Sequence, residues 1–157
     1  MLAHTNPCTV RVETSIDLPA EPERCFALVT DPERLGEWVT IHERIVEAPR
    51  LPLAKGAEMV QVLRLAGRGV EVRWRVEKLD PPHLIEWLGR GPLGSRARAL
   101  YRLEPLGNGR TRFEYLNEFD LPGGPLGKVA ARSVAPLARR ETDASLERLR
   151  ALIERES

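Results

Sequence analysis

Residues 96–120 read RARALYRLEPLGNGRTRFEYLNEFD, two alternating segments around a glycine-rich turn. Their period of two is typical of half-buried strands, and a loop at residues 107–109 with Gly109 in the left-handed conformation joins them into a hairpin. One face then carries opposite charges and the other carries rings and small side chains. The predicted pairs are Glu104 with Arg112, Arg102 with Glu114, Arg98 with Glu118, Arg96 with Asp120, Leu103 with Phe113, Tyr101 with Tyr115, Ala99 with Asn117, and Ala97 with Phe119.

Apolar and polar residues also alternate in the segments before this hairpin and just after it. Residues 10–16 predict a first strand, and residues 41–121 predict six more strands, separated by turn clusters such as AGRG and DPPH. The hairpin that turns at AGRG is expected to set Leu63 opposite Val72. The hairpin that turns at residues 79–82 is expected to set Trp74 opposite Trp87.

Helical signals flank the strands. Pro22 and Asp31 mark two short helices after the first strand, and apolar residues recur at helical spacing from Leu126 to Ile153. The apolar face of the sheet must be covered, and this last segment is the only long amphipathic element. We therefore predict an α+β fold: a seven-stranded curved antiparallel sheet wrapped around a long C-terminal helix, one domain over residues 1–157, with a cavity between sheet and helix.

Composition narrows the function classes. The 24 basic and 23 acidic residues nearly cancel, so the global positive field of a typical nucleic-acid-binding domain is absent. No apolar run approaches the roughly 18 residues of a membrane span, and the start lacks a signal-peptide pattern, so a cytoplasmic monomer or homodimer is expected. Cys8 and Cys25 have no metal-binding spacing, and neither a metal nor an organic cofactor is expected.

Two motif-like stretches have structural explanations. GRGPLG at residues 89–94 has the spacing of a dinucleotide fingerprint, but a strand-like segment follows where a helix is required, which indicates a hairpin turn. HERIV begins like a zinc-protease motif, yet Val46 stands where the second histidine must be. If this strand is regular, His42 points outward and Glu43 shares the inward side, either inside the cavity or at its mouth.

Several side chains on the apolar face are candidates for a binding site. Gln61 and Asn117 need hydrogen-bond partners there, in the protein, in water or on a ligand. The opposed Tyr101 and Tyr115 can offer two hydroxyls to one ligand, and with Glu43 they are weak candidates for acid–base catalysis. The predicted ligand-binding residues are Trp38, Met59, Gln61, Trp74, Trp87, Tyr101, Tyr115, Asn117 and Phe119. The aromatic residues among them are equally compatible with core packing.

Residues 15–38, SIDLPAEPERCFALVTDPERLGEW, contain a strand, a proline-bearing helix, a TDPE turn and a tryptophan. This order resembles the opening of the SRPBCC superfamily, the START and birch-pollen-allergen group with the helix-grip fold, and is similar to its polyketide cyclase/dehydrase and lipid-transport families. The resemblance implies a cavity for a hydrophobic ligand such as a lipid or a polyketide. WVTIH at residues 38–42 also resembles a branch of toxins from toxin–antitoxin pairs.

Three hypotheses of function follow. The leading one is binding, extending to transport, of a small hydrophobic molecule by aromatic walls and a few orienting polar groups. The second is a cyclase- or dehydratase-type enzyme that uses a tyrosine or glutamate of the cavity. The third is a toxin-like interaction protein that uses the outer face. No nucleic-acid partner is expected, because the arginines of residues 96–102 are predicted to pair with acids.

Overall fold

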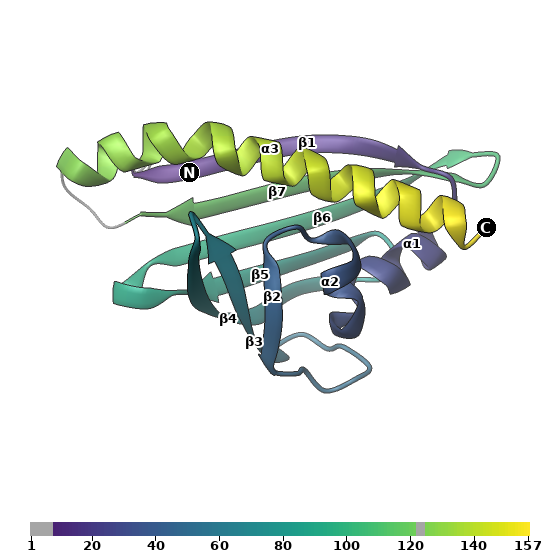
Figure 1. Cartoon of the computed structure of the whole chain (residues 1–157). Helices are drawn as coiled ribbons and strands as arrows, with labels where there is room; N and C mark the ends of the chain where they lie inside the picture. The colour runs from purple at the N-terminus through teal and green to yellow at the C-terminus, as the bar shows by residue number, and fades with distance from the viewer. Residues whose placement is uncertain (1–7, 122–124) are drawn as a thin grey trace, which may run out of the picture.

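The computed structural model describes residues 8–121 and 125–157, with the side chains of the last helix described from Val129 onward (Figure 1). A long strand comes first, two small helical segments follow it, six strands come next and one long helix ends the chain. The elements are β1 (Thr9–Leu18), α1 (Pro22–Val29), η1 (Pro32–Arg34), α2 (Leu35–Trp38), β2 (His42–Glu47), β3 (Glu58–Leu65), β4 (Arg68–Asp80), β5 (Leu84–Arg90), η2 (Pro92–Gly94), β6 (Arg96–Gly107), β7 (Arg110–Asp120) and α3 (Pro125–Arg155).

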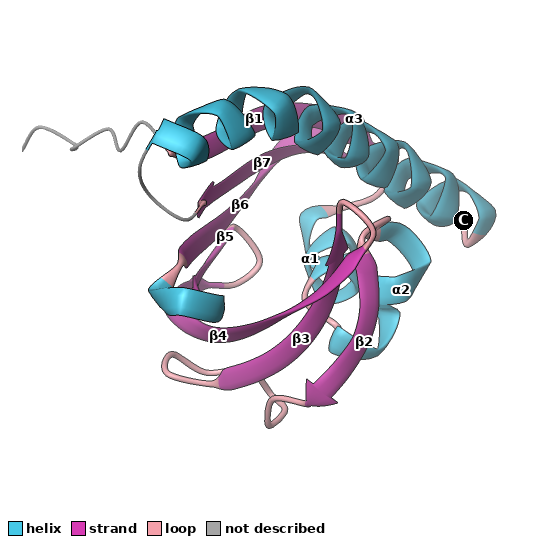
Figure 2. Ribbon diagram, turned by 60° about the vertical axis from the view of Figure 1, so that its left-hand side comes forward, coloured by secondary structure: helices cyan, strands magenta, loops and turns pink. Residues whose placement is uncertain are grey.

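All seven strands form one antiparallel sheet in the order β1-β7-β6-β5-β4-β3-β2. The sheet curls, so that β2, β3 and β4 swing round beneath α3 while α3 lies along β1 (Figure 2). Leu149 and Ile153 of α3 are fully buried and anchor the helix in the core. This arrangement confirms the predicted helix-grip architecture.

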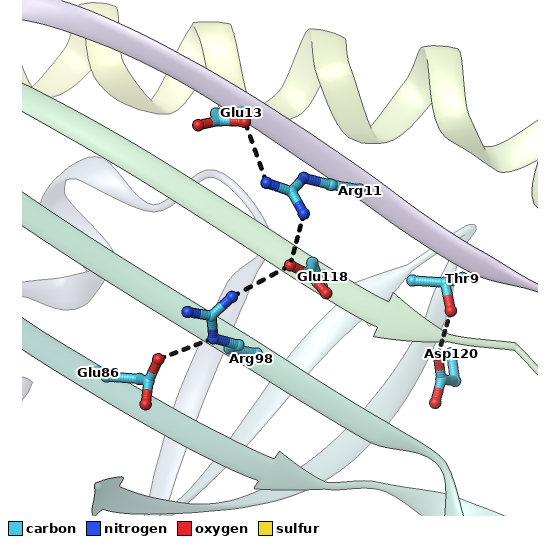
Figure 3. A network of polar contacts seen from close by, with 7 residues as sticks. All are labelled: Thr9, Arg11, Glu13, Glu86, Arg98, Glu118 and Asp120. Carbon is cyan, nitrogen blue, oxygen red and sulfur yellow. Dashed lines mark hydrogen bonds and ion pairs between the residues drawn. The ribbon is translucent and has the colours of Figure 1, made fainter. Parts of the chain in front are cut away.

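The β6–β7 hairpin has the predicted register. Tyr101 lies opposite Tyr115 and Arg102 opposite Glu114, and Gly109 has the expected left-handed conformation with φ 72°. On the outer face, Arg98 donates to the almost fully buried carboxylate of Glu86 at 2.8 Å and to Glu118 at 3.2 Å (Figure 3). Of the four predicted charge pairs, Arg98 with Glu118 forms an ion pair, whereas Arg112 pairs with Asp17 of β1 instead of Glu104. Arg96 and Arg102 form no ion pair with the described residues. The network of Arg98 nevertheless extends across four strands, from β5 to β1.

The β3–β4 hairpin differs from prediction by two residues. Its turn contains only Ala66 and Gly67, both with positive φ, which is the geometry of the tight turn that best matches strand twist. Leu63 consequently lies opposite Val70 instead of Val72. A two-residue shift keeps every side chain on its predicted face.

The predicted pairing of Trp74 with Trp87 is wrong. The turn between β4 and β5 lies at residues 81–83 instead of 79–82, and a bulge between Val76 and Lys78 changes the register by one residue, so that Trp74 lies opposite Gly89 and Trp87 lies opposite Val76. The glycine is required there, because a Cβ at position 89 would stand 2.8 Å from the ring of Trp74. Both tryptophans still point to the concave side of the sheet.

No helix in the described part of the chain is long and apolar enough to cross a membrane.

Helix α3 spans Pro125–Arg155 and runs continuously through Pro136. Its buried stripe faces the sheet, and its other face carries charged side chains.

Candidate functional site

Two adjacent chambers lie between the concave face of the sheet and the helices. The inner chamber has a volume of about 60 Å³ and the outer one a volume of about 710 Å³. Four residues line both and form a waist between them: Val39, Ile41, Tyr115 and Asn117. The outer chamber is within the usual size range of small-molecule sites, whereas the inner one has room for a few waters or a small group.

The inner chamber collects most of the residues predicted from the sequence. Ala99, opposite both Trp87 and Asn117 in register, supplies a small side chain that leaves space between larger neighbours. The predicted residues that line this chamber are Met59, Gln61, Trp74, Trp87, Tyr101, Tyr115 and Asn117.

Tyr101 and Tyr115 are stacked, with ring centroids 5.4 Å apart and ring planes inclined by 26°. Burial raises the pKa of Tyr101 well above its usual value and raises the pKa of Tyr115 to about 12, although the hydrogen bond from Asn117 partly opposes this. The Asn117 amide donates to the Tyr115 hydroxyl at 3.3 Å. Both phenols are therefore protonated at neutral pH and act as hydrogen-bond donors, which excludes them as general bases.

Gln61 is held at both ends of its side-chain amide. The indole N–H of Trp74 donates to its oxygen at 2.9 Å, and its nitrogen donates to Nδ1 of His42 at 2.8 Å. This geometry requires the neutral tautomer of His42 with its proton on Nε2. Desolvation lowers the pKa of His42, which favours the same neutral form. The partners that the sequence required for this buried amide are thus two protein side chains.

The predicted orientation of His42 and Glu43 is reversed in the structure. The register shifts between His42 and Arg44, which marks an irregularity in β2 at Glu43. His42 therefore shares the inward side with Gln61, while the Glu43 carboxylate forms an ion pair with Arg64 and lines neither chamber. Glu43 is not placed for chemistry inside the cavity, and its partner Arg64 lines the outer chamber.

Trp38 and Phe119 lie at different depths. Trp38 is completely buried behind Tyr101, with ring centroids 6.1 Å apart, and it lines neither chamber. Its indole N–H has no hydrogen-bond partner among the residues that the structure describes. Phe119 lines the outer chamber beside Ala97. Trp38 thus supports the wall from behind, whereas Phe119 forms part of it.

Sequence reasoning missed most of the outer chamber, including a polar cluster on α3. The Thr40 hydroxyl donates to the Glu141 carboxylate at 2.5 Å, and its backbone N–H donates to the Ser145 hydroxyl at 3.0 Å. The sequence did contain a signal for the α3 residues, because they recur at helical spacing along the side of α3 that lines this chamber. This side consists of Val134, Leu137, Ala138, Glu141, Thr142 and Ser145.

The described residues contain no group of three or more histidine, cysteine, aspartate or glutamate side chains placed to hold a metal ion. Cys8 and Cys25 are both buried thiols that form no disulfide. The polar side chains that line the chambers include phenols, amides, hydroxyls, the carboxylates of Asp120 and Glu141, and the guanidinium groups of Arg64, Arg68 and Arg96.

Comparison with known proteins gives consistent matches. The family described as polyketide cyclase/dehydrase and lipid transport matches residues 9–154. An uncharacterised protein of Mycobacterium tuberculosis is 35% identical over 127 residues, which cover 78% of this chain and 87% of that protein. A toxin of the same organism is 26% identical over 132 residues, which cover 79% of this chain and 87% of the toxin.

Solved structures show the same fold at low identity. An aromatase/cyclase from a Streptomyces species has a TM-score of 0.75 at 18% identity, covering 94% of both chains. A START superfamily protein from Mycobacterium smegmatis has a TM-score of 0.72 at 17% identity, covering 94% of this chain and 99% of that one. At such identities these structures are similar in fold alone.

Proposed function

This chain belongs to the polyketide cyclase/dehydrase and lipid transport family, and we propose that it binds one small hydrophobic molecule in the outer chamber. The observation that carries this proposal is the chamber of about 710 Å³ with largely apolar walls and a few polar groups at its waist. Pockets of this size and composition hold small organic ligands.

The two volumes support a place for the ligand body in the outer chamber. The aromatic inner chamber, at about 60 Å³, accommodates only an end group, such as a methyl or a single polar function. The body of the ligand lies above the waist against Val72, Phe119 and Leu137, which come from three separate elements. Affinity then comes chiefly from the apolar area removed from water.

Polar groups at the waist and on α3 orient the ligand. Tyr115 accepts from Asn117 and, as a protonated phenol, still has a proton to donate. Glu141 accepts from Thr40 through one oxygen and keeps further acceptor capacity on the helix side. A ligand with a carbonyl or hydroxyl group about halfway along an apolar body fits this arrangement.

Two matched variants test the binding chamber. Ala138→Phe places a ring in the outer chamber, whereas Ala144→Phe places the same ring on the exposed face of α3. Native mass spectrometry of protein purified from its own host should show a bound hydrophobic molecule in the Ala144→Phe protein and lose it in the Ala138→Phe protein. Equal occupancy in both folded variants would exclude the outer chamber as the binding site.

Variants at the waist and the inner wall test the residue assignments separately. Trp74→Ala and Asn117→Ala should each weaken binding of the molecule identified in this way, measured by titration of stripped protein. Circular dichroism controls for the fold. Unchanged affinity in both variants would show that the inner chamber and the waist are not part of the binding site.

A cyclase- or dehydratase-type activity is the second candidate, and the stacked tyrosines favour it. Two protonated phenols that approach the same chamber can donate to the oxygen of one carbonyl and stabilise the negative charge that develops on enolisation. Glu141 is then the candidate proton acceptor, because it lines the outer chamber, whose lining also includes Tyr115. Activity on a polyketone substrate should fall in both Tyr115→Phe and Glu141→Gln if this reaction occurs. The toxin relative supports no further assignment.

A further inference from the structure

Three segments surround the mouth of the outer chamber, and we call them the rim. They are the β3–β4 turn at residues 64–68, the loop between β5 and β6 that contains η2, and the first half of α3. In the fold, the β5–β6 loop and the start of α3 lie on the same side of the molecule (Figure 2). Residues of all three segments line the outer chamber, so the rim borders one opening.

The rim exposes apolar side chains that the core does not require. Leu93, at the tip of the β5–β6 loop, is 92% exposed and has φ 58° and ψ 30°. A leucine rarely adopts this left-handed conformation, because its Cβ crowds the backbone. Leu137 and Val129 of α3 are exposed as well. Leu93 contributes no packing energy to the isolated chain, because its side chain lies in solvent, and its backbone conformation is strained. These two features indicate that Leu93 contacts another molecule.

All three rim segments are basic. Residues 64–69, 90–98 and 129–140 contain arginines and no aspartate or glutamate. Arg90 and Arg96 are direct cross-strand neighbours, and Arg73 lies on the other side of Arg90. Like charges in such positions repel each other. Arg68, Arg90 and Arg96 form no ion pair with the described residues, so their charge is available to a partner.

The acids near the mouth already have partners. Glu43 pairs with Arg64, Asp120 accepts from the Thr9 hydroxyl at 2.7 Å, and Glu141 accepts from Thr40. Glu47 and Glu58 both pair with Arg73 on the outer face. Asp120 and Glu141 keep their negative charges, because their partners are neutral hydroxyls. The rim is positive because its arginines outnumber these acids, even though the whole chain carries a formal net charge of only +1.

We propose that the rim docks on an anionic lipid bilayer, with Leu93 inserted among the lipid headgroups and Arg68, Arg90 and Arg96 bound to lipid phosphates. Exposed apolar side chains next to basic ones are the combination that holds proteins at such interfaces. A nucleic acid satisfies the arginines but offers no apolar partner to Leu93 or Leu137. The docked rim places the mouth of the chamber against the hydrophobic phase, which extends the proposed function by naming the source of the ligand.

Sedimentation with lipid vesicles tests the docking surface on the full chain. The protein should bind vesicles of phosphatidylcholine with phosphatidylglycerol, and should bind vesicles of phosphatidylcholine alone much more weakly. Added salt should weaken the binding. The double variant with Arg90→Ser and Arg96→Ser should lose about 30-fold in affinity. Leu93→Asn should lose about tenfold, and because asparagine tolerates the left-handed conformation, its thermal stability should equal or exceed that of the parent.

Exposed residues away from the rim supply matched controls. Leu51→Asn changes a 63% exposed leucine in the β2–β3 connection, and Arg110→Ser changes an arginine at the opposite end of the β6–β7 hairpin. Both should bind vesicles like the parent. Absence of vesicle binding, equal binding to both vesicle types, or equal losses in the controls would overturn the proposal. So would arginine-dependent binding of a short RNA or DNA duplex without vesicle binding.

Docking and ligand binding can fail independently in these experiments. Vesicle sedimentation uses protein stripped of its bound molecule, and it does not require the outer chamber to be filled. Loss of vesicle binding by a protein that still holds its hydrophobic molecule would contradict only the docking proposal. Vesicle binding by a protein that holds no hydrophobic molecule would remove only the ligand proposal.

Discussion

The side-chain nitrogen of Gln61 donates to Nδ1 of His42 at 2.8 Å, which joins the wall of the inner chamber to a histidine that reaches the molecular surface. The indole N–H of Trp74 completes this series of hydrogen bonds by donating to the oxygen of the same amide. Because the amide donates to His42, the bond exists only while His42 is neutral. Protonation of the imidazole turns Nδ1 into a donor and places two donors face to face.

Acid should therefore destabilise the fold through His42. Its pKa is lowered by desolvation, so the unfolded chain binds the proton more readily, and the stability that this group contributes is present above its usual pKa of 6.5 and lost as the pH falls below that value. Between about pH 7 and pH 5 we expect a loss of less than about 1 kcal/mol, because water screens this half-buried group. Urea unfolding of the parent and of His42→Gln should show this pH-dependent difference, and identical pH profiles would contradict it.

The tyrosine pair should titrate at unusually high pH. The chain contains two tyrosines, Tyr101 and Tyr115, so phenolate absorbance reports on this pair alone. Little ionisation is expected near pH 10, and the first phenolate should appear at about pH 12 or when the fold opens. Because the pKa values are raised, the stability they contribute is present below pH 10 and lost as the pH rises further. An ordinary titration near pH 10 in the folded protein would contradict the burial of both hydroxyls.

Gly89→Ala should destabilise the protein by about 1–3 kcal/mol through overpacking. The added Cβ would meet two ring atoms of Trp74 at 2.8 Å and a methyl of Val72 at 2.9 Å. Gly36→Ala is the matched control, because its Cβ would meet only His42, at 3.5 Å, and it lies in a helix where alanine is favourable. Chemical denaturation distinguishes the two, and equal stability of both variants would contradict the close approach.

Thr40→Val should cost about 1–2 kcal/mol of unfolding free energy. The hydroxyl donates to Glu141, and its removal leaves that carboxylate without this donor beside an apolar chamber. Thr142→Val is a matched control, because the Thr142 hydroxyl donates only to the carbonyl of Ala138 within its own helix. Its effect should be less than half as large. Equal effects would contradict a specific stabilising contact between Thr40, which precedes β2, and α3.

Much of the inner chamber was predictable because side chains alternate along a strand. The register errors in β3–β4 and β4–β5 arose from the positions of the two turns and from a bulge in β4, none of which the turn residues alone reveal. Trp74 and Trp87 nevertheless reached the predicted chamber, because each strand kept its inward face. In β2 the irregularity at Glu43 changed the inward face itself, and the roles of His42 and Glu43 were exchanged.

The sequence by itself determined the order of the elements, the β6–β7 register and the side chains of the concave face, because period, turn and charge pairing are local properties of neighbouring segments. Only the tertiary structure decided where the large chamber and its basic rim lie. Their walls come from the β3–β4 turn, the β5–β6 loop and α3, which are far apart in the chain. These segments meet because the sheet curls around the helix, and that curvature is a property of the whole sheet.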